Sequence, residues 1–289
     1  MRGFEFVQPK SLGEAVALLD TDDPTVRAHS GGTALMLMMK TGVFAPSLLV
    51  GLQAVEERHG QIEATMDGGL RIGAMASLTT VEHSADVARV APVVVRAMKR
   101  LANTRVRNVA RMGGNLAHGD PHMDLPPVLS ALRGEVSTLG PKGSRRIAIE
   151  NLFAGYYETV LQRGELIADV IIPSQAGWSS AYLKCTTKTS DDWPALGVAA
   201  SLHLNGDRIV DARVMISAAT DKLTRVAGAE AELRGGKADA ATFARAAEVA
   251  AIGVETIDDA RGSAIYKTEL VRVYVRRALA EIMTGRSST

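Results

Sequence analysis

The chain has 289 residues, of which 46% are apolar, and its 33 basic and 32 acidic residues leave a net charge of +1. This length allows two domains, and the balanced charge argues against a nucleic acid as the main partner. No stretch reaches the roughly 18 apolar residues of a membrane-spanning helix, and the first residues lack a signal peptide's apolar core, so we expect a cytoplasmic protein. Cys185 is the only cysteine, which excludes an internal disulfide and an iron–sulfur cluster carried by this chain alone.

Residues 1–55 alternate between strand and helix patterns. Short apolar runs predict strands at 4–7, 26–29 and 48–50. Helices are predicted at 12–19, opened by a capping box of Ser11 and Glu14, and at 33–39. Because strands that alternate with helices form parallel sheets, this segment predicts a small parallel βαβαβ unit.

A glycine pair lies where the second helix of this unit begins, in the run Ser30-Gly31-Gly32-Thr33-Ala34-Leu35. Since glycine has no Cβ, such a pair lets the backbone approach a ligand closely and turn consecutive N–H groups toward one point. N–H groups arranged in this way form an anion-binding nest. The dipole of the following helix favours an anion at the same place, so a phosphate is the predicted ligand.

Residues 56–176 mix strand and helix patterns. Strands are predicted at 70–74 and 165–172, helices at 92–101 and 125–132, and a second capping box at 79–82. Between residues 96 and 111 the chain carries six basic residues and no acidic one: Arg96, Lys99, Arg100, Arg105, Arg107 and Arg111. This pattern fits a solvated surface, and it also fits neutralisation of a bound phosphate by Arg111.

The second glycine pair follows in the run Arg111-Met112-Gly113-Gly114-Asn115-Leu116-Ala117-His118-Gly119-Asp120-Pro121. It is a second candidate nest. Two nests brought together by folding would hold the two halves of a pyrophosphate, which indicates a dinucleotide cofactor. The Gly-x-Gly-x-x-Gly fingerprint is absent, so the predicted cradle is not that of a Rossmann fold.

Four potential metal ligands alternate along the next stretch: His118, Asp120, His122 and Asp124. In an extended segment they would share a face and could bind a divalent metal, as in a metal-dependent hydrolase. A second interpretation makes Asp124 the N-cap of the helix at 125–132, with two prolines in its first turn. In a third, Asp120 and Asp124 accept hydrogen bonds from ligand hydroxyls, a role that is compatible with capping.

Residues 177–289 begin with strands and continue as helices. Strands are predicted at 182–187, 196–204 and 209–217, the last two joined by an Asn205-Gly206 hairpin turn, and helices at 224–233, 240–254 and 265–283. The predicted fold class is α+β. A two-part module with subdomains 1–55 and 56–176 precedes an antiparallel sheet with a helical bundle at 177–289.

The loop between the first two of these C-terminal strands contains Asp191, Asp192 and Trp193. A tryptophan in a loop most often anchors a core, but the flat indole is also a common cover for a ligand ring. The sequence leaves both roles open.

Together these motifs resemble the FAD-binding medium subunit of molybdenum-containing hydroxylases, a group that includes carbon monoxide, nicotine, quinoline and xanthine dehydrogenases. Their FAD module is of the vanillyl-alcohol-oxidase type. The likeness begins at Phe6–Ala15, is most specific at 107–124, and reaches the C-terminal domain. It implies that residues 1–176 form an FAD-binding module with no catalytic residue and no metal. The implied cofactor contacts are Ser30, Gly31, Gly32, Thr33, Ala34, Leu35, Leu101, Arg111, Met112, Gly113, Gly114, Asn115, His118, Asp120, Asp124, Leu166, Lys184, Asp192 and Trp193.

The resemblance also implies individual roles for these contacts. Both glycine pairs hold the FAD pyrophosphate, and Asp124 binds the ribose side. Leu101 and Leu166 flank the adenine, whereas Lys184 and Asp192 lie near the flavin.

Trp193 falls where the family often has an aromatic residue that shields one face of the isoalloxazine. Two other positions depart from the family pattern. Ala34 stands where Asp or Ser is frequent, and Arg111 stands where Ser or Thr is usual. Both changes remove a polar group near the phosphates, and Arg111 replaces it with a positive charge.

In this family the organic substrate is oxidised by a molybdopterin-containing large subunit, and an iron–sulfur small subunit relays the electrons to FAD. The resemblance therefore implies an electron-transfer subunit in a hetero-oligomer, a dimer of heterotrimers. The single cysteine agrees, because each cluster needs four ligands. The alternatives are a stand-alone FAD-dependent oxidase and, on the residues above, the metal-dependent hydrolase.

Overall fold

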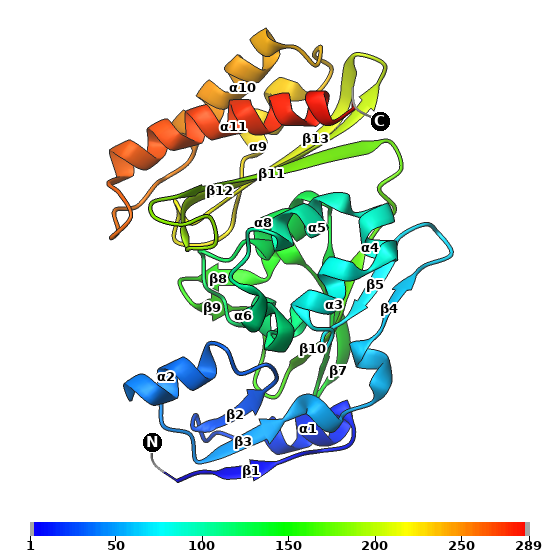
Figure 1. Cartoon of the computed structure of the whole chain (residues 1–289), viewed down its shortest axis with the longest axis vertical. Coiled ribbons are helices and arrows are strands. Elements are labelled where there is room, and N and C mark those ends of the chain that lie inside the picture. The colour runs from blue at the N-terminus through cyan, green and yellow to red at the C-terminus, as the bar shows by residue number, and fades with distance from the viewer. Residues whose placement is uncertain (1–2, 287–289) are drawn as a thin grey trace.

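The computed structural model describes residues 3–286 as three parts stacked along the long axis of the molecule (Figure 1). A small N-terminal sheet lies at one end, a five-stranded sheet with short helices occupies the middle, and a four-stranded sheet covered by longer helices forms the other end. The predicted α+β class is confirmed. Within residues 3–286 no helix is long and apolar enough to cross a bilayer.

The N-terminal unit is the predicted parallel sheet. Its strands lie in the order β1 (Glu5–Val7), β3 (Leu48–Gly51) and β2 (Val26–His29), and both pairs are parallel. The connecting helices are α1 (Leu12–Leu19) and α2 (Leu35–Thr41). Parallel strands place their carboxyl ends at one edge of the sheet, the usual position of a ligand in an α/β unit.

The two helices of this unit begin differently from the prediction. The Ser11 hydroxyl accepts a hydrogen bond from the Glu14 N–H at 3.1 Å, but the Glu14 carboxylate accepts from the N–H of Lys10 instead of that of Ser11. Only half of the predicted capping box therefore forms. Helix α2 begins at Leu35, two residues later than predicted, because Gly32 has a φ of +70° and keeps the chain in a turn.

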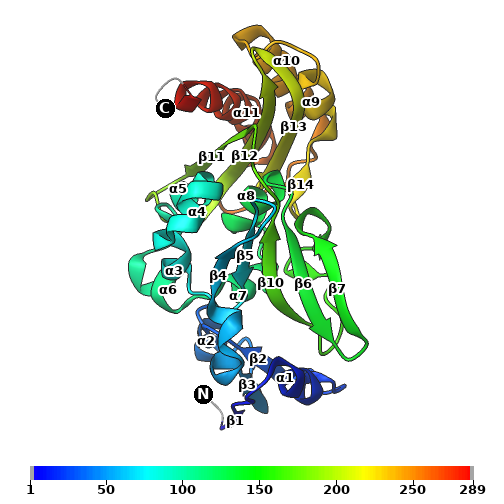
Figure 2. The same ribbon diagram turned by 90° about the vertical axis from the view of Figure 1, so that its right-hand side faces the viewer.

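The middle unit is built on an antiparallel sheet (Figure 2), whose strands follow the order β4 (Ile62–Ala64), β5 (Leu70–Gly73), β10 (Leu166–Ile172), β6 (Glu135–Gly140) and β7 (Gly143–Ala148). The sequence predicted β5 and β10, which are largely buried. It missed β7 because this edge strand is polar and exposed over its first four residues. A two-stranded ribbon of β8 (Phe153–Gly155) and β9 (Glu158–Thr159) lies beside the sheet.

The middle unit also contains short helices: α3 (Leu78–His83), α4 (Ala85–Val90), α5 (Pro92–Met98), α6 (Thr104–Val109), α7 (Met112–Ala117) and α8 (Leu125–Ala131), with 3-10 turns η1 (Leu52–Ala54), η2 (Glu57–Gly60) and η3 (Ile149–Asn151). The predicted capping box at 79–82 is wrong. Ser77 caps α3 by accepting from the Thr80 N–H, and the Glu82 carboxylate instead pairs with Arg107 at 2.8 Å. The helix predicted at 92–101 ends at Met98.

The C-terminal sheet is antiparallel, in the order β11 (Trp178–Thr186), β12 (Pro194–Asn205), β13 (Arg208–Ser217) and β14 (Thr224–Arg225). Gly206 has a φ of +63° in the predicted hairpin turn. The helix predicted from residue 224 begins three residues later, because residues 224–225 pair with β13 instead. The C-terminal helices are α9 (Ala227–Leu233), α10 (Ala240–Gly253) and α11 (Ala264–Arg286).

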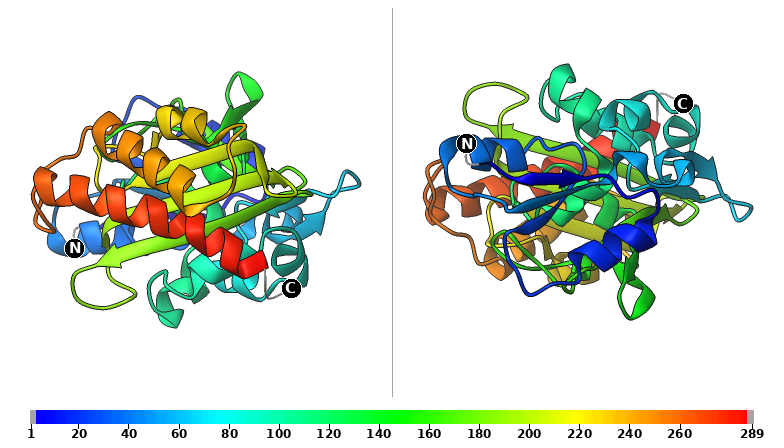
Figure 3. Two further views of the ribbon diagram at one scale, coloured as in Figure 1. Left: turned by 90° about the horizontal axis from the view of Figure 1, so that it is seen from above. Right: turned by 90° about the horizontal axis from the view of Figure 1, so that it is seen from below.

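Both faces of this C-terminal sheet are buried. Alternate residues of β12, from Leu196 to Leu204, belong to the core beneath α9, α10 and α11, which cover this face of the sheet (Figure 3). On the opposite face Tyr182, Ala199 and Met215 belong to the core of the middle unit, under α5 and α8. The core of the middle unit therefore extends onto one face of the C-terminal sheet, while the other face belongs to a separate core.

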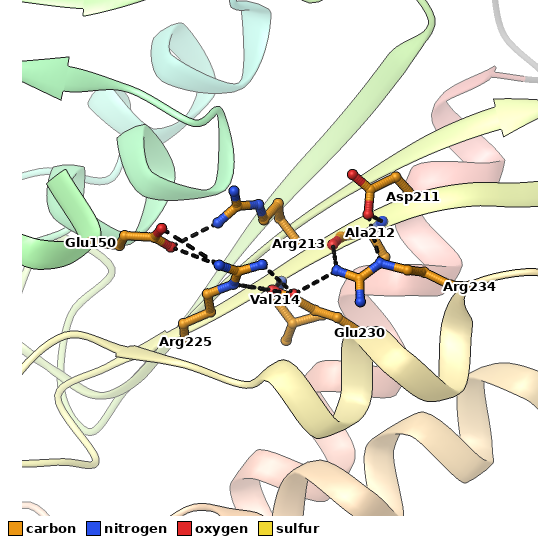
Figure 4. A network of polar contacts seen from close by, with 8 residues as sticks. All are labelled: Glu150, Asp211, Ala212, Arg213, Val214, Arg225, Glu230 and Arg234. Carbon is orange, nitrogen blue, oxygen red and sulfur yellow. Dashed lines mark hydrogen bonds and ion pairs between the residues drawn. The ribbon is translucent and has the colours of Figure 1, made fainter. Parts of the chain in front are cut away.

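A polar network also crosses between these two units (Figure 4). The buried Glu230 carboxylate on α9 accepts hydrogen bonds from Arg225 at 2.8 Å and from Arg234 at 3.0 Å. Arg225 also reaches Glu150 in η3 at 3.4 Å, and Arg213 on β13 contacts the same carboxylate at 2.7 Å. Because Glu230 is paired on two sides, its burial is compensated.

Candidate cofactor site

The fold brings the two glycine pairs into contact. A Cβ added to Gly31 would lie 2.1 Å from the carbonyl oxygen of Val109 and 2.8 Å from the Cα of Ala110. A Cβ added to Gly114 would lie 2.6 Å from the Ser30 Oγ. Only glycine allows backbones to approach this closely. Segments that are far apart in the sequence, one from each of the first two units, thus form a single site.

His29 and Gln53 hold the first glycine segment in place. The Gln53 amide donates to the carbonyl of Ser30 at 2.6 Å and lies 2.9 Å from the His29 Nδ1. Burial lowers the pKa of His29, which favours the neutral ring. Both residues were missed in the sequence. Their position at the carboxyl ends of two neighbouring parallel strands, β2 and β3, is the pattern that could have revealed them.

The turn between these residues and α2 has an open backbone. Thr33 and Ala34 precede the helix, and the Met36 N–H donates to the carbonyl of Gly32 at 2.9 Å. Among the described residues no backbone carbonyl accepts from the N–H groups of Gly32, Thr33 or Ala34. These donors lie at the start of α2, where a phosphate would be favoured.

The second glycine pair is more closed than the predicted nest. It lies in the first turn of α7, where the Gly113 N–H donates to the carbonyl of Ala74 at 2.8 Å and the Met112 N–H donates to that of Ala76 at 3.0 Å. A Cβ on Gly113 would lie 2.7 Å from the Cβ of Ala74. Gly113 is therefore a packing residue, and Gly114 is the member of the pair that faces the first segment.

Three buried polar atoms in this second segment have no hydrogen-bond partner in the described structure: Arg111 Nε, Asn115 Oδ1 and Asp120 Oδ2. Buried polar atoms are normally paired, so each of them indicates a missing partner. One is a cationic donor and two are acceptors. A ligand with both phosphate oxygens and hydroxyl groups would satisfy all three, and FAD has both.

Asp120 and His122 form a pair close to these atoms. The Asp120 Oδ1 accepts from the His122 N–H at 2.9 Å and lies 3.0 Å from the ring Nδ1. Burial acts to raise the pKa of Asp120, but these contacts outweigh it and hold the pKa below its ordinary value. Burial lowers the pKa of the nearby His118, whose ring packs edge-on against Tyr157 at 5.1 Å.

Asp124 lies at the predicted N-cap of α8, but its side chain makes no cap hydrogen bond. Its carboxylate instead accepts from the Tyr182 hydroxyl at 2.5 Å and from the Lys184 Nζ at 3.1 Å, across the boundary with the C-terminal sheet. Lys184 also donates to the carbonyl of Arg100 at 3.0 Å, beside Leu101. Burial raises the pKa of Asp124, and the Lys184 charge opposes this rise.

The two leucines expected to flank one ring belong to different hydrophobic clusters. Leu101 lies in the core of the middle unit, and Leu166 lies in the core shared by α1, β3 and β10. Asp192 is half-buried and accepts from the N–H of Trp193 at 2.8 Å. Trp193 is 44% exposed, which rules out a core anchor.

The four alternating residues of the metal alternative point to different partners. Asp124 contacts Tyr182 and Lys184, whereas His122 lies between Asp120 and a residue of the C-terminal unit, Asp259, at 3.3 Å from the latter. Within residues 3–286 no three His, Cys, Asp or Glu side chains converge as a metal site would require. This geometry argues against the metal-dependent hydrolase.

Comparison with known proteins gives two family matches: residues 2–175 match the FAD binding domain in molybdopterin dehydrogenase, and residues 180–282 match the CO dehydrogenase flavoprotein C-terminal domain. The nicotine 6-hydroxylase medium subunit of Paenarthrobacter nicotinovorans is 33% identical over 96% of each chain. The carbon monoxide dehydrogenase medium chain of Hydrogenophaga pseudoflava is also 33% identical over 96% of each chain.

Solved structures show the same fold. A carbon monoxide dehydrogenase from Hydrogenophaga pseudoflava superposes with a TM-score of 0.93 at 31% identity over 97% of each chain. Quinoline 2-oxidoreductase from Pseudomonas putida 86 gives 0.91 at 28% identity over 98% of each chain.

The fold, the two glycine segments and the matches to known proteins identify the chain as a flavoprotein subunit of an oxidoreductase. Its cofactor is FAD. More narrowly, the chain belongs to the family of FAD-binding medium subunits of molybdenum-containing hydroxylases. The resemblance seen in the sequence is confirmed.

Proposed function

We propose that this chain carries FAD as the electron-transfer subunit of a molybdenum-containing hydroxylase. Electrons would reach the FAD from iron–sulfur clusters on a small partner subunit and leave to an external acceptor. The contact between the two glycine segments, with buried unpaired polar atoms beside it, carries this proposal. The single cysteine supports it too, since clusters on this chain would lack ligands.

The cofactor contacts belong to the same proposal. The free N–H groups of the first segment and the Arg111 guanidinium would bind the pyrophosphate, a charge-assisted arrangement that is stronger than neutral hydrogen bonds. The Asp120 Oδ2 would accept from a hydroxyl of the cofactor. FAD supplies the redox chemistry when bound, and the residues of this chain bind it, orient it and exclude water from it.

The remaining predicted contacts complete this proposal. Met112 and Gly113 would support the second segment through packing, and Lys184 would place a positive charge near the flavin through its contact with Asp124. Trp193 would cover one face of the ring. Leu101 and Leu166 belong to separate hydrophobic clusters and would lie on the two sides of the adenine ring.

The assembly is proposed from the names of the relatives, which are medium subunits or chains. We propose a molybdopterin-containing large subunit and an iron–sulfur small subunit as partners, in a dimer of heterotrimers located in the cytoplasm. Within the chain, the FAD-binding module would be residues 1–176 and the C-terminal domain residues 177–289.

Anaerobic titration tests the electron-relay role. The isolated chain should purify yellow with FAD, lose its flavin absorbance when given dithionite, and keep that absorbance when given any organic substrate that the intact complex oxidises. Adding the partner subunits should then allow the substrate to bleach the flavin. Bleaching by substrate without partners would overturn the proposal and favour the stand-alone oxidase.

A further inference from the structure

Trp193 lies between two side chains that come from distant parts of the chain. Its ring centroid is 6.5 Å from that of His122, which follows the second glycine segment, with 40° between the ring planes. The Arg261 guanidinium lies 5.3 Å from the same indole centroid, in cation–π geometry. Because Trp193 is 44% exposed, no surrounding core holds the indole. Its position therefore depends on His122, Arg261 and its own loop.

His122 and Arg261 are joined through Asp259. One oxygen of the Asp259 carboxylate lies 3.3 Å from the His122 Nε2, and the other accepts from the Arg261 N–H at 2.8 Å. Asp259 and Gly262 also exchange backbone hydrogen bonds at 3.1 and 3.3 Å, which closes a tight turn with Arg261 inside it. The turn therefore fixes the backbone from which the Arg261 side chain reaches the indole.

A buried cation anchors this junction. The Lys267 ammonium on α11 is fully buried and lies 2.9 Å from the Asp259 Oδ2. It also donates to the carbonyl of Ala218 at 3.3 Å. Burial acts to raise the pKa of Asp259, but Lys267, the Arg261 N–H and His122 together hold the pKa below its ordinary value. A buried ammonium without this carboxylate would be strongly destabilising, so the pair fixes Asp259.

The same junction contacts the cofactor loop on its other side. Ala218 has a φ of +66°, unusual for a residue with a Cβ, and its N–H donates to the carbonyl of Pro121 at 2.9 Å. Pro121 lies between Asp120 and His122, which contact each other. A continuous set of polar contacts thus runs from Lys267 in the C-terminal domain to Asp120, whose second oxygen is unpaired.

From this arrangement we propose that His122 and Arg261, fixed through Asp259 and Lys267, are positioning residues that hold the Trp193 indole at the flavin site. The inference rests on the proposed function in one respect, the location of Trp193 beside the flavin. The C-terminal domain thereby sets how openly one face of the flavin meets its acceptor. Neither His122 nor Arg261 touches the reacting atoms in this account.

The test uses tryptophan emission from the full chain. Trp178→Phe leaves Trp193 as the only indole, because the chain has two tryptophans. In this background Arg261→Gln removes the cation and Arg261→Lys retains a charge without the planar stack. Arg245→Gln is the matched control, since Arg245 is exposed and pairs with Glu232 on the far helices.

Acrylamide quenching of the FAD-free chain measures how firmly the indole is held. Loss of an exposed cation–π contact should raise the population of freely accessible indole about two- to five-fold for Arg261→Gln. Arg261→Lys should give an intermediate value, and Arg245→Gln should match the parent. Asp259→Asn should act in the same direction, and Arg261→Gln remains informative where loss of the Asp259 charge prevents folding.

Flavin fluorescence of the FAD-loaded chain then tests whether Trp193 lies at the flavin. The Arg261→Gln chain should retain FAD but show brighter flavin emission, because a displaced indole quenches the ring less. Unchanged acrylamide quenching in the FAD-free chain would overturn the positioning role. A released indole with unchanged flavin emission would overturn the placement at the flavin, while FAD retention by the glycine segments, measured separately by absorbance, would still stand.

Discussion

At the scale of single residues, the two members of a glycine pair have different tasks. Gly113 is excluded from the ligand by its contact with Ala74 and serves packing, whereas Gly114 faces the Ser30 hydroxyl alone. Gly31 is needed for the approach of the Val109 carbonyl, so it joins the first two units. A Gly-Gly step in a sequence therefore indicates a close approach without saying which glycine meets the ligand.

Gly114→Val is expected to release FAD and leave the fold intact. The new side chain would displace Ser30 and intrude on the cofactor, and the loss of one or two charge-assisted hydrogen bonds should weaken FAD binding by about ten- to a hundred-fold. Flavin absorbance per protein after gel filtration measures the binding, and thermal unfolding measures the fold. By contrast, the new methyl group of Gly113→Ala would clash with the Ala74 Cβ and should lower the melting temperature.

A double variant separates intrusion on the cofactor from a local clash. Ser30→Gly removes both Ser30 side-chain atoms that lie within 4 Å of the new Cβ at Gly114, so the pair of substitutions should fold as well as the parent. FAD should still be lost from it. Full flavin occupancy in Gly114→Val would contradict the model of two converging glycine segments.

Residues of the candidate site that lie close to the glycine runs could be proposed from the sequence. Residues that the fold brings to the site from distant segments could not. Ser30–Leu35 and Arg111–Asn115 were recognisable because glycine, charge and spacing are local features. His29 and Gln53 act through the ends of neighbouring strands, and Asp259 reaches His122 from 137 residues away. No local pattern encodes that contact, because it depends on the packing of the middle unit against the C-terminal unit.

At the scale of elements, the carboxylate of Glu165, just before β10, links three strands of the middle sheet. It accepts from the Arg145 guanidinium on β7, from the hydroxyl of Thr138 on β6 and from the Gln162 N–H, at 2.6 to 2.7 Å. Burial acts to raise its pKa, but these donors outweigh burial and lower the pKa of Glu165 to about 2. Charged-group hydrogen bonds of this kind stabilise the sheet edge that the sequence did not predict.

The stability of the sheet should therefore depend on pH through Glu165. Because the pKa is lower in the folded chain, the ionised carboxylate stabilises the fold above the unfolded pKa of roughly 4.3 and loses that effect as the pH falls toward 2. Glu165→Gln should lower the free energy of unfolding by about 2 kcal/mol at pH 7. Urea titrations should show this difference between parent and variant shrinking at pH 3.

The matched control for this prediction is Glu135→Gln on β6. Its carboxylate lies 3.6 Å from Arg146 and both side chains are largely exposed, so the change should stay within about 0.5 kcal/mol. Equal losses in both variants, or a Glu165 effect that does not change with pH, would refute the assignment.

Element types were predictable where burial and periodicity agreed. The parallel unit, β12, β13 and the C-terminal helices all carry regular apolar patterns that tertiary packing reinforces. Boundaries failed where a competing local contact prevailed, as when Ser77 instead of Thr79 capped α3, or residues 224–225 joined β13. The short helices α6 and α7 were missed because six residues give too little periodicity to recognise.

At the scale of the whole molecule, the sequence pattern changes clearly near residue 176, but residues on the two sides of this boundary pack together. The C-terminal sheet places Tyr182, Ala199 and Met215 in the core of the middle unit. The buried pair of Asp124 and Lys184 crosses the same boundary. A domain whose sheet packs one apolar face against its neighbour is not expected to be stable alone, because that face would be exposed to water.

Separate expression of residues 1–176 and 177–289 tests this interdependence. Alone, the C-terminal piece should aggregate or unfold without a cooperative transition, since it exposes an apolar sheet face and leaves the Lys184 ammonium without its carboxylate. The N-terminal piece should bind FAD weakly, because Lys184 and Trp193 lie outside it and the junction that holds His122 is lost. Co-expression should restore a stoichiometric complex with flavin absorbance. Two pieces that unfold cooperatively on their own, with full FAD occupancy in the first, would show that the site belongs to the N-terminal module alone and that the packing between the two pieces contributes little to it.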